Sequence, residues 1–451
     1  MSRLAAAGPL RLEEREPLLD VLRGLALLGI LILNMPAFGM PYQGGANPRV
    51  FGGDEGLDLL LWAGAETLVE GSMRALFSML FGAGFALFLD RLDARGVGGG
   101  RAAGLYGRRL LALAGFGLID GYVLLWTGDI LYTYAVAGFF LLPFREAKPP
   151  LLVAAAAVLL LLQGLLYWGG GVRLEANQAA FGEVVRLEDR GRTPSPQLAA
   201  QARDWERYLD DVVPEGPAIA RDIMAHRDGY ADLVERQAEA FTAIQRDLTW
   251  TGLLPTLDVW PVMLLGLAAL RLGWLRSRAP RGVVLGLLGV GYGLGLPLSA
   301  WETWVFWDSG FDPVVEARRD VTYDLSRLLM AAGHAGLVLL LPRRGGSFPF
   351  VGTALSRVGR MALSNYLLQS LMALLVFSGA GLGLYGALSR SALMGAVLGF
   401  WAVNLGFSWF WLHHFRYGPA EWLWRAITYG AFPALRLPPA SATGESPPHP
   451  G

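Results

Sequence analysis

Long apolar runs separated by short polar connections dominate the hydrophobic pattern of the chain. Ten segments are long enough to cross a bilayer core of about 30 Å, which takes about 20 helical residues. Their predicted boundaries are 19–38, 72–90, 108–126, 128–144, 150–168, 251–270, 283–304, 322–341, 361–379 and 391–412. A glycine-rich loop follows the first segment, and residues 57–70 then predict an interfacial or half-embedded helix. The pattern predicts an all-α polytopic membrane protein with about ten transmembrane helices.

One connection is much longer than the others. Residues 172–248 are highly charged and show helical periodicity, which predicts a small helical extracytoplasmic subdomain. It either caps a cavity or binds a partner, or it is a solvated helical insertion. It divides the chain into a first membrane half, 18–171, and a second, 249–436, which ends in an amphipathic interfacial helix from Pro419. Residues 1–17 predict a cytoplasmic leader before a retained helix, and 437–451 a disordered tail.

Composition supports the membrane interpretation and excludes several classes of function. Hydrophobic residues make up 53% of the 451 positions and charged residues 17%, below the roughly 25% of soluble domains. The net charge of zero gives no bulk electrostatic reason to bind nucleic acid. The chain has no cysteine, which excludes disulfides and thiolate catalysis. It also lacks a P-loop, HExxH, GxSxG and Cys/His metal spacing, so no metal or permanently bound cofactor is predicted.

Basic residues predict the orientation of the chain. Arginines concentrate on alternate connections, beginning before the first segment and after the second. Because cytoplasmic loops carry an excess of basic residues, both termini should be cytoplasmic. Lys148 is the one lysine, and arginine dominance with abundant alanine and glycine indicates a GC-rich bacterial source. The predicted location is therefore the bacterial inner membrane.

Polar residues interrupt the first apolar segment at both of its ends. Asp20, Arg23 and Asn34 fall on one stripe of a helix, because Arg23 and Asn34 are eleven positions apart. A polar stripe on a spanning helix should face protein or a wet cavity rather than lipid. The alternative is that these side chains sit at the level of the lipid headgroups.

Three further charged residues fall in the first half of the chain. Arg74 enters the second segment from the extracytoplasmic side, where it lines a cavity or extends to the interface. Asp120 lies within the third segment, where an unpaired carboxylate is costly and marks a paired or functional group. Asp129 precedes the next helix, where it either caps the free amides or serves a site.

The second half supplies a comparable set. Arg327 and His334 stack on one face of the eighth segment, and a histidine at membrane depth either moves protons or packs with its hydrogen bonds satisfied. The ninth region concentrates polar side chains that either join helices or bind a polar ligand. Its candidate residues are Arg360, Ser364, Asn365 and Gln369.

Five motifs carry a resemblance to a known family. They are "LLDVLRGLALLGILILNM", "FSMLFGAGFALF", "WTGDILYTYAVAG", "VGRMALSNYLLQS" and "FRYGPAEWLWRAITYG". The chain resembles the YeiB-like bacterial membrane proteins, domain-of-unknown-function family 418, from about residue 18 to 436. That family is distantly similar to transmembrane acyltransferases, including the heparan glucosaminide acetyltransferase group.

The resemblance to acyltransferases has specific departures. Asn34 matches an asparagine in the first span of the acetyltransferase group, but their histidine in the first extracytoplasmic loop has no counterpart between Asn34 and Glu70. The acyltransferase three group has a histidine where Asn34 stands. Many YeiB-like proteins have a histidine where this chain has Asp120, so a carboxylate would replace an imidazole.

Two functions of different classes follow as hypotheses. A transmembrane acyltransferase would carry an acyl group from a cytoplasmic donor such as acyl-CoA to a lipid or glycan acceptor, using Asp120 or His334 as the base. Asn34 and Asn365 would donate to the carbonyl or substrate, and Arg23, Arg327 or Arg360 would hold the donor's phosphates. The alternative is a transporter or exporter of a small polar or amphipathic solute. The sequence leaves the acceptor and the oligomeric state open.

Overall fold

The computed structural model describes residues 16–250, 253–275, 279–341 and 349–437. Nearly all of the predicted leader and tail, and the start of the segment at 251–270, lie outside these ranges. Every regular element described is helical, and one isolated bridge pairs Phe415 with Arg436. The helices are α1 (Pro17–Gly39), α2 (Tyr42–Ala46), α3 (Gly56–Leu68), α4 (Ser72–Ala94), α5 (Gly99–Tyr122), α6 (Leu131–Phe139), the 3₁₀ turn η3 (Leu142–Phe144), α7 (Pro149–Asp189), α8 (Pro196–Val212), α9 (Gly216–His226), α10 (Tyr230–Trp250), α11 (Leu253–Arg271), α12 (Arg281–Asp308), α13 (Pro313–Leu339), α14 (Phe350–Arg360), α15 (Ala362–Phe377), α16 (Arg390–His414) and α17 (Pro419–Tyr429).

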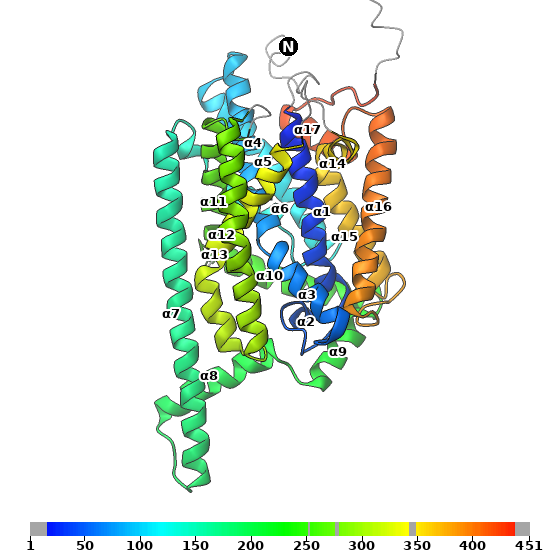
Figure 1. Ribbon diagram of the computed structural model, residues 1–451. Helices are drawn as coiled ribbons and strands as arrows, with labels where there is room; N and C mark the ends of the chain where they lie inside the picture. The colour runs from blue at the N-terminus through cyan, green and yellow to red at the C-terminus, as the bar shows by residue number, and fades with distance from the viewer. Residues whose placement is uncertain (1–15, 251–252, 276–278, 342–348, 438–451) are drawn as a thin grey trace, which may run out of the picture.

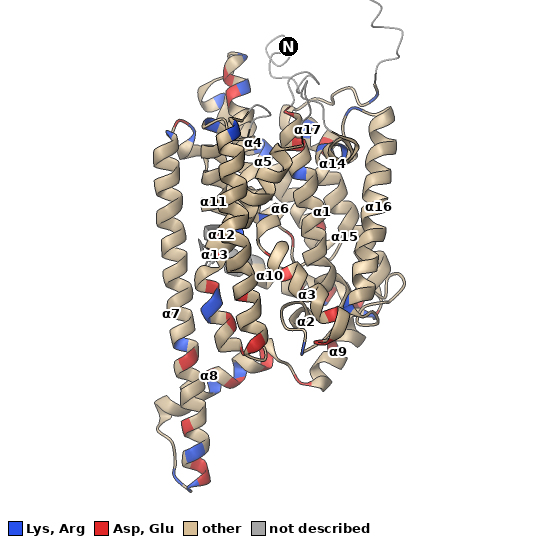
Figure 2. Ribbon diagram, viewed as in Figure 1, with Lys and Arg blue, Asp and Glu red and all other residues tan. Residues whose placement is uncertain are grey.

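The helices form an upright bundle with two sides (Figure 1). On one side α4, α7, α11, α12 and α13 pack together, and on the other α1 packs with α14, α15 and α16. Helices α5 and α6 lie between them, and α17 closes one end of the bundle. We call that end, at the top of Figure 1, the upper end, and the opposite end, where α9 lies, the lower end. Charged residues gather towards the two ends of the bundle (Figure 2).

Several helices are long and apolar enough to cross a membrane. Among the described residues these stretches are Pro17–Gly39, Gly56–Ala94, Gly99–Tyr122, Pro149–Asp189, Arg281–Asp308 and Arg390–His414. Helices α14 and α15 make a seventh if counted as one span, although they are bent by 81° at Met361. The all-α, membrane-spanning architecture is therefore confirmed in coarse form, and the predicted count of about ten is not.

The lower count has identifiable causes. The segment predicted at 128–144 forms only the nine residues of α6 and a 3₁₀ turn, and nine helical residues extend about 14 Å, half of a bilayer core. Helix α13 is 27 residues long, which is enough to cross a membrane, but its charged residues make it too polar to count as a membrane span. These residues include Arg318, Arg319, Asp320, Asp324 and Arg327. The helix packs against α12 and α7 within the bundle.

The charged connection at 172–248 forms three helices, α8 to α10, which cover the lower end. The predicted boundary at 171–172 lies inside α7, which continues without a break to Asp189. Helix α8 packs against this outer part of α7 (Figure 1). At the end of α9, the carbonyl of His226 accepts a hydrogen bond from the amide of Gly379 at 3.0 Å. The inserted helices are thus attached to the loop between α15 and α16.

Glycines set the closest helix contacts. A Cβ added at Gly82 of α4 would overlap the carbonyl of Met263, and one added at Gly266 of α11 would overlap the carbonyl of Met79. The two helix backbones are therefore in close contact at Gly82 and Gly266. Because small residues let helix backbones approach each other, α4 and α11 form one rigid pair.

Candidate functional site

A cavity of about 240 Å³ opens between α1, α4, α5, α15 and α17 near the upper end. Its polar lining is predominantly basic, with the arginines Arg23, Arg91, Arg95, Arg109, Arg360 and Arg425 against the acids Glu16, Asp20 and Glu421. Its deeper wall is aromatic, with Phe77, Phe81, Phe85, Phe88, Tyr134 and Tyr366. We call it the upper cavity. It suits an anionic group attached to an apolar chain, because arginine binds phosphate and carboxylate while the rings exclude water.

Three of the residues predicted from the sequence meet in this cavity. Arg23 donates to Asp20 at 3.0 Å, and Arg360 joins them from α14. Helix α14 approaches α1 closely because both carry glycine at the contact, and a Cβ at Gly359 would overlap the carbonyl of Asp20. The buried Nε of Arg360 has no hydrogen-bond partner among the described residues, so the cavity offers a charged donor to a ligand.

Helix α17 supplies the wall opposite α1. The guanidinium of Arg109 lies 3.6 Å from the ring centre of Trp424, whose Nε1 donates to the carbonyl of Arg109 at 2.7 Å. A cation stacked on an indole in this way fixes both side chains. The interfacial helix predicted from Pro419 is present as α17, and it packs against α5.

Ser364 and Glu421 join α15 to α17. Glu421 accepts from the amides of Leu363 at 2.7 Å and Ser364 at 3.1 Å at the start of α15, and from the Ser364 hydroxyl. The Ser364 hydroxyl in turn accepts from the amide of Ala420 at 3.0 Å, at the start of α17. Each side chain therefore caps the other's helix, since free amides at a helix start require acceptors.

A second cavity, of about 780 Å³, lies near the lower end, between the lower part of α1, the loop at 124–128, α9, α10 and α15. We call it the lower cavity. Its lining includes Phe38, Trp126, Ser370 and Phe377 from the membrane part, and Asp222, His226 and Gln237 from the inserted helices. Residues of the 172–248 segment therefore form part of the wall of this cavity.

Aromatic side chains separate the two cavities. Tyr366 lines the upper cavity and Trp126 the lower, and the Trp126 Nε1 donates to the Tyr366 hydroxyl at 3.2 Å. The amide of Ile130 donates to the same hydroxyl at 3.2 Å, and the ring of Phe38 lies 4.2 Å from that of Trp126. We call Tyr366, Trp126 and Phe38 the partition.

Both predicted aspartates lie beside the partition. Asp129 accepts from the amides of Leu131 at 3.0 Å and Tyr132 at 2.8 Å, which is the helix cap that its position favoured. Asp120 is fully buried, and neither of its carboxyl oxygens has a hydrogen-bond partner among the described residues. It interacts with Asp129 and with Ser370, which lines the lower cavity. Asp120 is therefore a candidate acid or base beside the partition.

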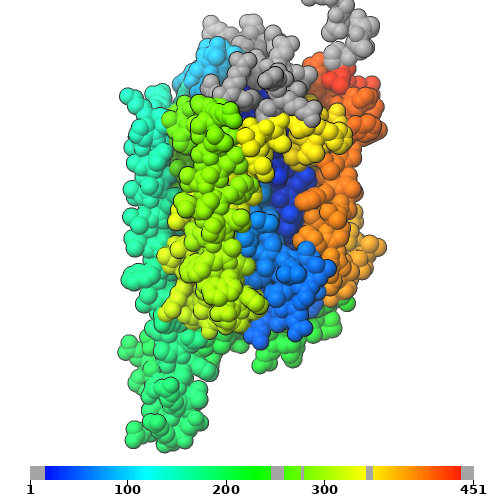
Figure 3. Space-filling view, in the orientation of Figure 1, coloured from blue at the N-terminus to red at the C-terminus, as the bar shows by residue number. Residues whose placement is uncertain are grey.

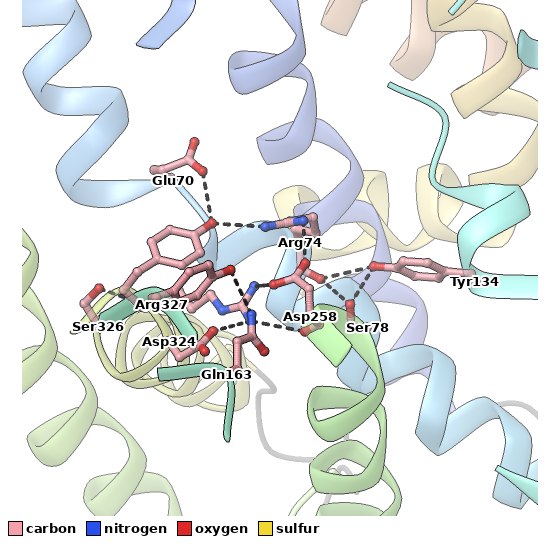
Figure 4. Close-up of polar contacts among 11 residues, drawn as sticks. Glu70, Arg74, Ser78, Tyr134, Gln163, Asp258, Asp324, Ser326 and Arg327 are labelled. Atoms are coloured by element: carbon pink, nitrogen blue, oxygen red, sulfur yellow. Dashed lines mark hydrogen bonds and ion pairs between the residues drawn. The ribbon is translucent and has the colours of Figure 1, made fainter. Parts of the chain in front are cut away.

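Arg74 and Arg327 belong to a separate group of charges within the bundle, shown in Figure 4, in which Arg327 is buried and Arg74 is partly exposed. Asp258 of α11 pairs with Arg74 Nη1 and with Arg327 Nη1, each at 2.5 Å, and Arg327 also pairs with Asp324. Arg74 donates to the Tyr323 hydroxyl at 3.1 Å. We call Arg74, Asp258, Arg327, Asp324 and Tyr323 the charge cluster. Arg74 therefore pairs inside the bundle instead of extending to the interface, and neither arginine lines a cavity described above.

The other predicted residues occupy packing positions. Tyr292 and the carbonyl of Leu68 each lie 2.9 Å from a ring nitrogen of His334, as the packing interpretation predicted. Asn365 donates to the Ser408 hydroxyl at 2.7 Å, and Gln369 donates to Asn404 at 3.5 Å, joining α15 to α16. The linings of both cavities omit His334 and these amides.

Asn34 is half-buried and also lies outside both linings. Asp20 and Arg23 therefore line the upper cavity while Asn34, on the same face of α1, does not, because only the upper part of α1 reaches this cavity. Helix α1 is visible at the base of a hollow on the surface between α12 and α16 (Figure 3).

Sequence reasoning missed several residues that the structure places at these sites. Asp258, His226, Trp126 and Arg109 each have a partner far away in the sequence. One sequence signal could have identified Asp258. It is an acid within an apolar segment, and other apolar segments of the chain contain two arginines, so an ion pair between them is expected. Among the described residues, no group of three or more histidine, aspartate or glutamate side chains could hold a metal ion.

The comparisons with known proteins assign a family. A model described as "Protein of unknown function (DUF418)" matches residues 269–431. The uncharacterized protein YeiB of Escherichia coli K12 is 31% identical over 423 residues, covering 93% of this chain and 97% of its own length. The uncharacterized protein YxaH of Bacillus subtilis 168 is 30% identical over 434 residues, covering 94% and 97%. No solved structure matches.

Proposed function

The chain belongs to the YeiB-like DUF418 family, and we propose that it is a transmembrane acyltransferase of the bacterial inner membrane. The observation that supports this most is the pairing of two cavities across one partition. The upper cavity suits the donor of an acyl group, and the lower cavity suits its acceptor. The basic connections predict that the upper end faces the cytoplasm, where acyl-CoA is available.

The upper cavity has the chemistry that an acyl-CoA donor requires. Arg23 and Arg360 at its mouth would bind phosphate groups, and the aromatic wall would surround the acyl chain. Its volume of about 240 Å³ is below the range of about 300–1,000 Å³ for sites that enclose a drug-sized ligand. The acyl and adjoining part of the donor would therefore lie inside, with the nucleotide at the mouth.

The thioester would then reach the partition, where Asp120 and Ser370 lie. Acyl transfer needs a group that takes a proton from the acceptor and donors that stabilise the oxyanion. Neither Asp120 nor His334 lines a cavity directly, but Asp120 is favoured because it interacts with Ser370, which lines the lower cavity. The Trp126 and Tyr366 polar groups at the partition would donate to the reacting carbonyl.

The test is binding of acetyl-CoA and decanoyl-CoA to the detergent-purified protein, measured as a thermal shift. A ligand at 100 times its Kd stabilises by about 2.7 kcal/mol, so a clear rise in melting temperature is expected. Arg23→Ala or Arg360→Ala should weaken binding about 10- to 100-fold, because a hydrogen bond to a charged group contributes about 1.5–3 kcal/mol. Arg186→Ala, on the exposed outer part of α7, is the matched control. No shift with either acyl-CoA would refute the donor site.

A transporter or exporter is the second candidate, and one observation favours it. Two cavities at opposite ends, separated by a closed partition, are also the arrangement that alternating access requires. The two functions differ in product. Labelled acyl groups found covalently on a lipid or glycan support the transferase, whereas accumulation of unmodified solute in sealed vesicles supports transport.

A further inference from the structure

The lower cavity contains a histidine–aspartate pair that no membrane helix supplies. His226 and Asp222 lie on α9, one helical turn apart, and both line the cavity. The His226 Nδ1 lies 2.9 Å from the carbonyl oxygen of Asp222 and 3.2 Å from its carboxylate Oδ1. Since these oxygens only accept hydrogen bonds, the Nδ1 must carry the proton in the neutral ring. The lone pair is then on Nε2.

The surroundings hold this pair in a fixed position. The hydroxyl of Tyr385 donates to the other Asp222 oxygen, Oδ2, at 3.0 Å, and its ring stacks on the imidazole with centres 3.9 Å apart. Burial opposes ionisation of Asp222, but the hydrogen bonds from His226 and Tyr385 outweigh it and lower the pKa of that carboxyl. Arg236 of α10 adds a positive charge that acts on both Asp222 and Tyr385. The carboxylate therefore stays charged beside the ring.

The reactive nitrogen is at the cavity. The His226 Nε2 lies 2.9 Å from the side-chain amide nitrogen of Gln237, which also lines the cavity and donates to the Nε2 lone pair. A hydroxyl group of a ligand can replace this neutral amide by donating to the same lone pair. His226 is 19% exposed at its side chain, so a ligand in the cavity reaches it while bulk water is mostly excluded.

On the basis of the proposed acyltransferase function, we propose that His226 accepts the proton of a hydroxyl-bearing acceptor in the lower cavity, with Asp222 and Tyr385 as positioning residues. The acceptor's O–H bond breaks and its proton goes to Nε2, while its oxygen bonds to the acyl carbon. The C–S bond breaks with its electron pair on sulfur, and the thiolate takes a proton from water. His226 then returns its proton to water on the lower side. In this assignment His226, which lines the lower cavity, takes the acceptor's proton in place of Asp120, which is fully buried beside the partition.

The alternative is that His226 only attaches α9 to the loop after α15. Backbone contacts already make that attachment, because the carbonyl of His226 accepts from Gly379 and the carbonyl of Tyr385 accepts from the Arg227 Nε at 2.8 Å. His226→Gln should therefore leave the fold intact. A catalytic role of His226 predicts that His226→Gln slows acyl transfer, whereas a purely structural role predicts no such effect in the folded protein.

The experiment measures CoA thiol released from decanoyl-CoA by the purified full chain, with water and with glycerol as acceptor. The chain has no cysteine, so a thiol reagent reports CoA alone. His226→Gln should slow release at least 100-fold, because a general base contributes about 10²–10⁴. The loss should fall on kcat, with the KM for decanoyl-CoA unchanged. Decanoyl-CoA binding by thermal shift should be unchanged, because the upper cavity is intact.

Two further variants complete the test. Asp222→Asn should slow release at least tenfold without loss of the melting temperature, and it decides the matter if His226→Gln fails to fold. His413→Gln, on the exposed end of α16, is the matched control and should match the wild type. If the wild type releases thiol and either His226→Gln or Asp222→Asn, correctly folded, releases it at the wild-type rate, only the role of His226 is refuted. If the wild type binds no acyl-CoA and releases no thiol, both the proposed acyltransferase function and the role of His226 are refuted.

Discussion

Removal of the Asp258 carboxylate should destabilise the bundle more than any other single change in the charge cluster. One carboxylate group accepts from Arg74 and Arg327, each at 2.5 Å, and the Arg327 side chain is only 2% exposed. Asp258→Asn keeps the shape of the side chain but removes the charge that both arginines share. Breaking a buried ion pair from one side costs about 3–5 kcal/mol, because the remaining charge stays desolvated.

The structure also ranks the variants. Arg74→Met should cost only about 1 kcal/mol, because Arg74 is 36% exposed and Asp258 keeps its pair with Arg327. Arg327→Met should fall between the two, since it leaves Asp324 without its partner while Asp258 keeps Arg74. Arg186→Met, on the exposed surface of α7, should change the free energy of unfolding by less than about 0.5 kcal/mol.

The assay is unfolding in mixed micelles with increasing SDS, followed by the fluorescence of the 15 tryptophans. The double variant Asp258→Asn/Arg327→Met completes a cycle, and the two changes should be non-additive by about 0.5–3 kcal/mol because the groups touch. If Arg74→Met costs as much as Asp258→Asn, or Asp258→Asn costs less than about 1 kcal/mol, Asp258 is not the shared centre of a desolvated cluster.

Two smaller perturbations test how the helices around the cavities are held. Gly82→Ala should destabilise by about 1–3 kcal/mol in the same assay, because its Cβ would overlap the Met263 carbonyl. Gly84→Ala on the same helix is the control, because its Cβ meets nothing within 4 Å and the change should be neutral or slightly stabilising. Equal effects of the two substitutions would contradict the close contact at Gly82. Glu421→Ala should cost about 2 kcal/mol and weaken acyl-CoA binding, because α15 loses its cap and the Ser364 hydroxyl that caps α17 loses its acceptor. The exposed Glu188→Ala should do neither, and unchanged stability of Glu421→Ala would show that this cap is dispensable.

The parts of the molecule that the sequence predicted well depend on local pattern. Apolar runs identified α1, α4, α5, α12 and α16, because burial in lipid acts on each helix separately. Helical periodicity likewise identified α8 and α10, and a helix-start proline identified α17. The cap at Asp129 could be read from its position before a helix for the same reason.

The errors arise where the environment differs along a single helix or depends on a distant one. The sequence predicted α13 as a shorter apolar segment, because its arginines find their partners on other helices: Arg318 pairs with α7, Arg319 with α3 and Arg327 with α11. Asn34 shares the stripe of Arg23, but the upper cavity ends before it. His226 lies beside Tyr385, although the two residues are far apart in the sequence. The neighbouring Arg227 makes a contact of the same range, because its Nε donates to the carbonyl of Tyr385, 158 positions away. Periodicity contains no information about such contacts.

The unbroken course of α7 has a mechanical consequence for the inserted helices. An α-helix of 41 residues is about 60 Å long, roughly twice the depth of a bilayer core. Its inner part is fixed to α13, where Glu175 pairs with Arg318 at 2.5 Å, and its outer part carries α8. Each residue advances a helix by about 100°, so one residue added beyond Glu175 would swing α8 around the axis by more than a quarter turn. The number of residues in α7 therefore determines the direction in which α8 projects from the helix axis, and so whether α8 lies over the lower cavity.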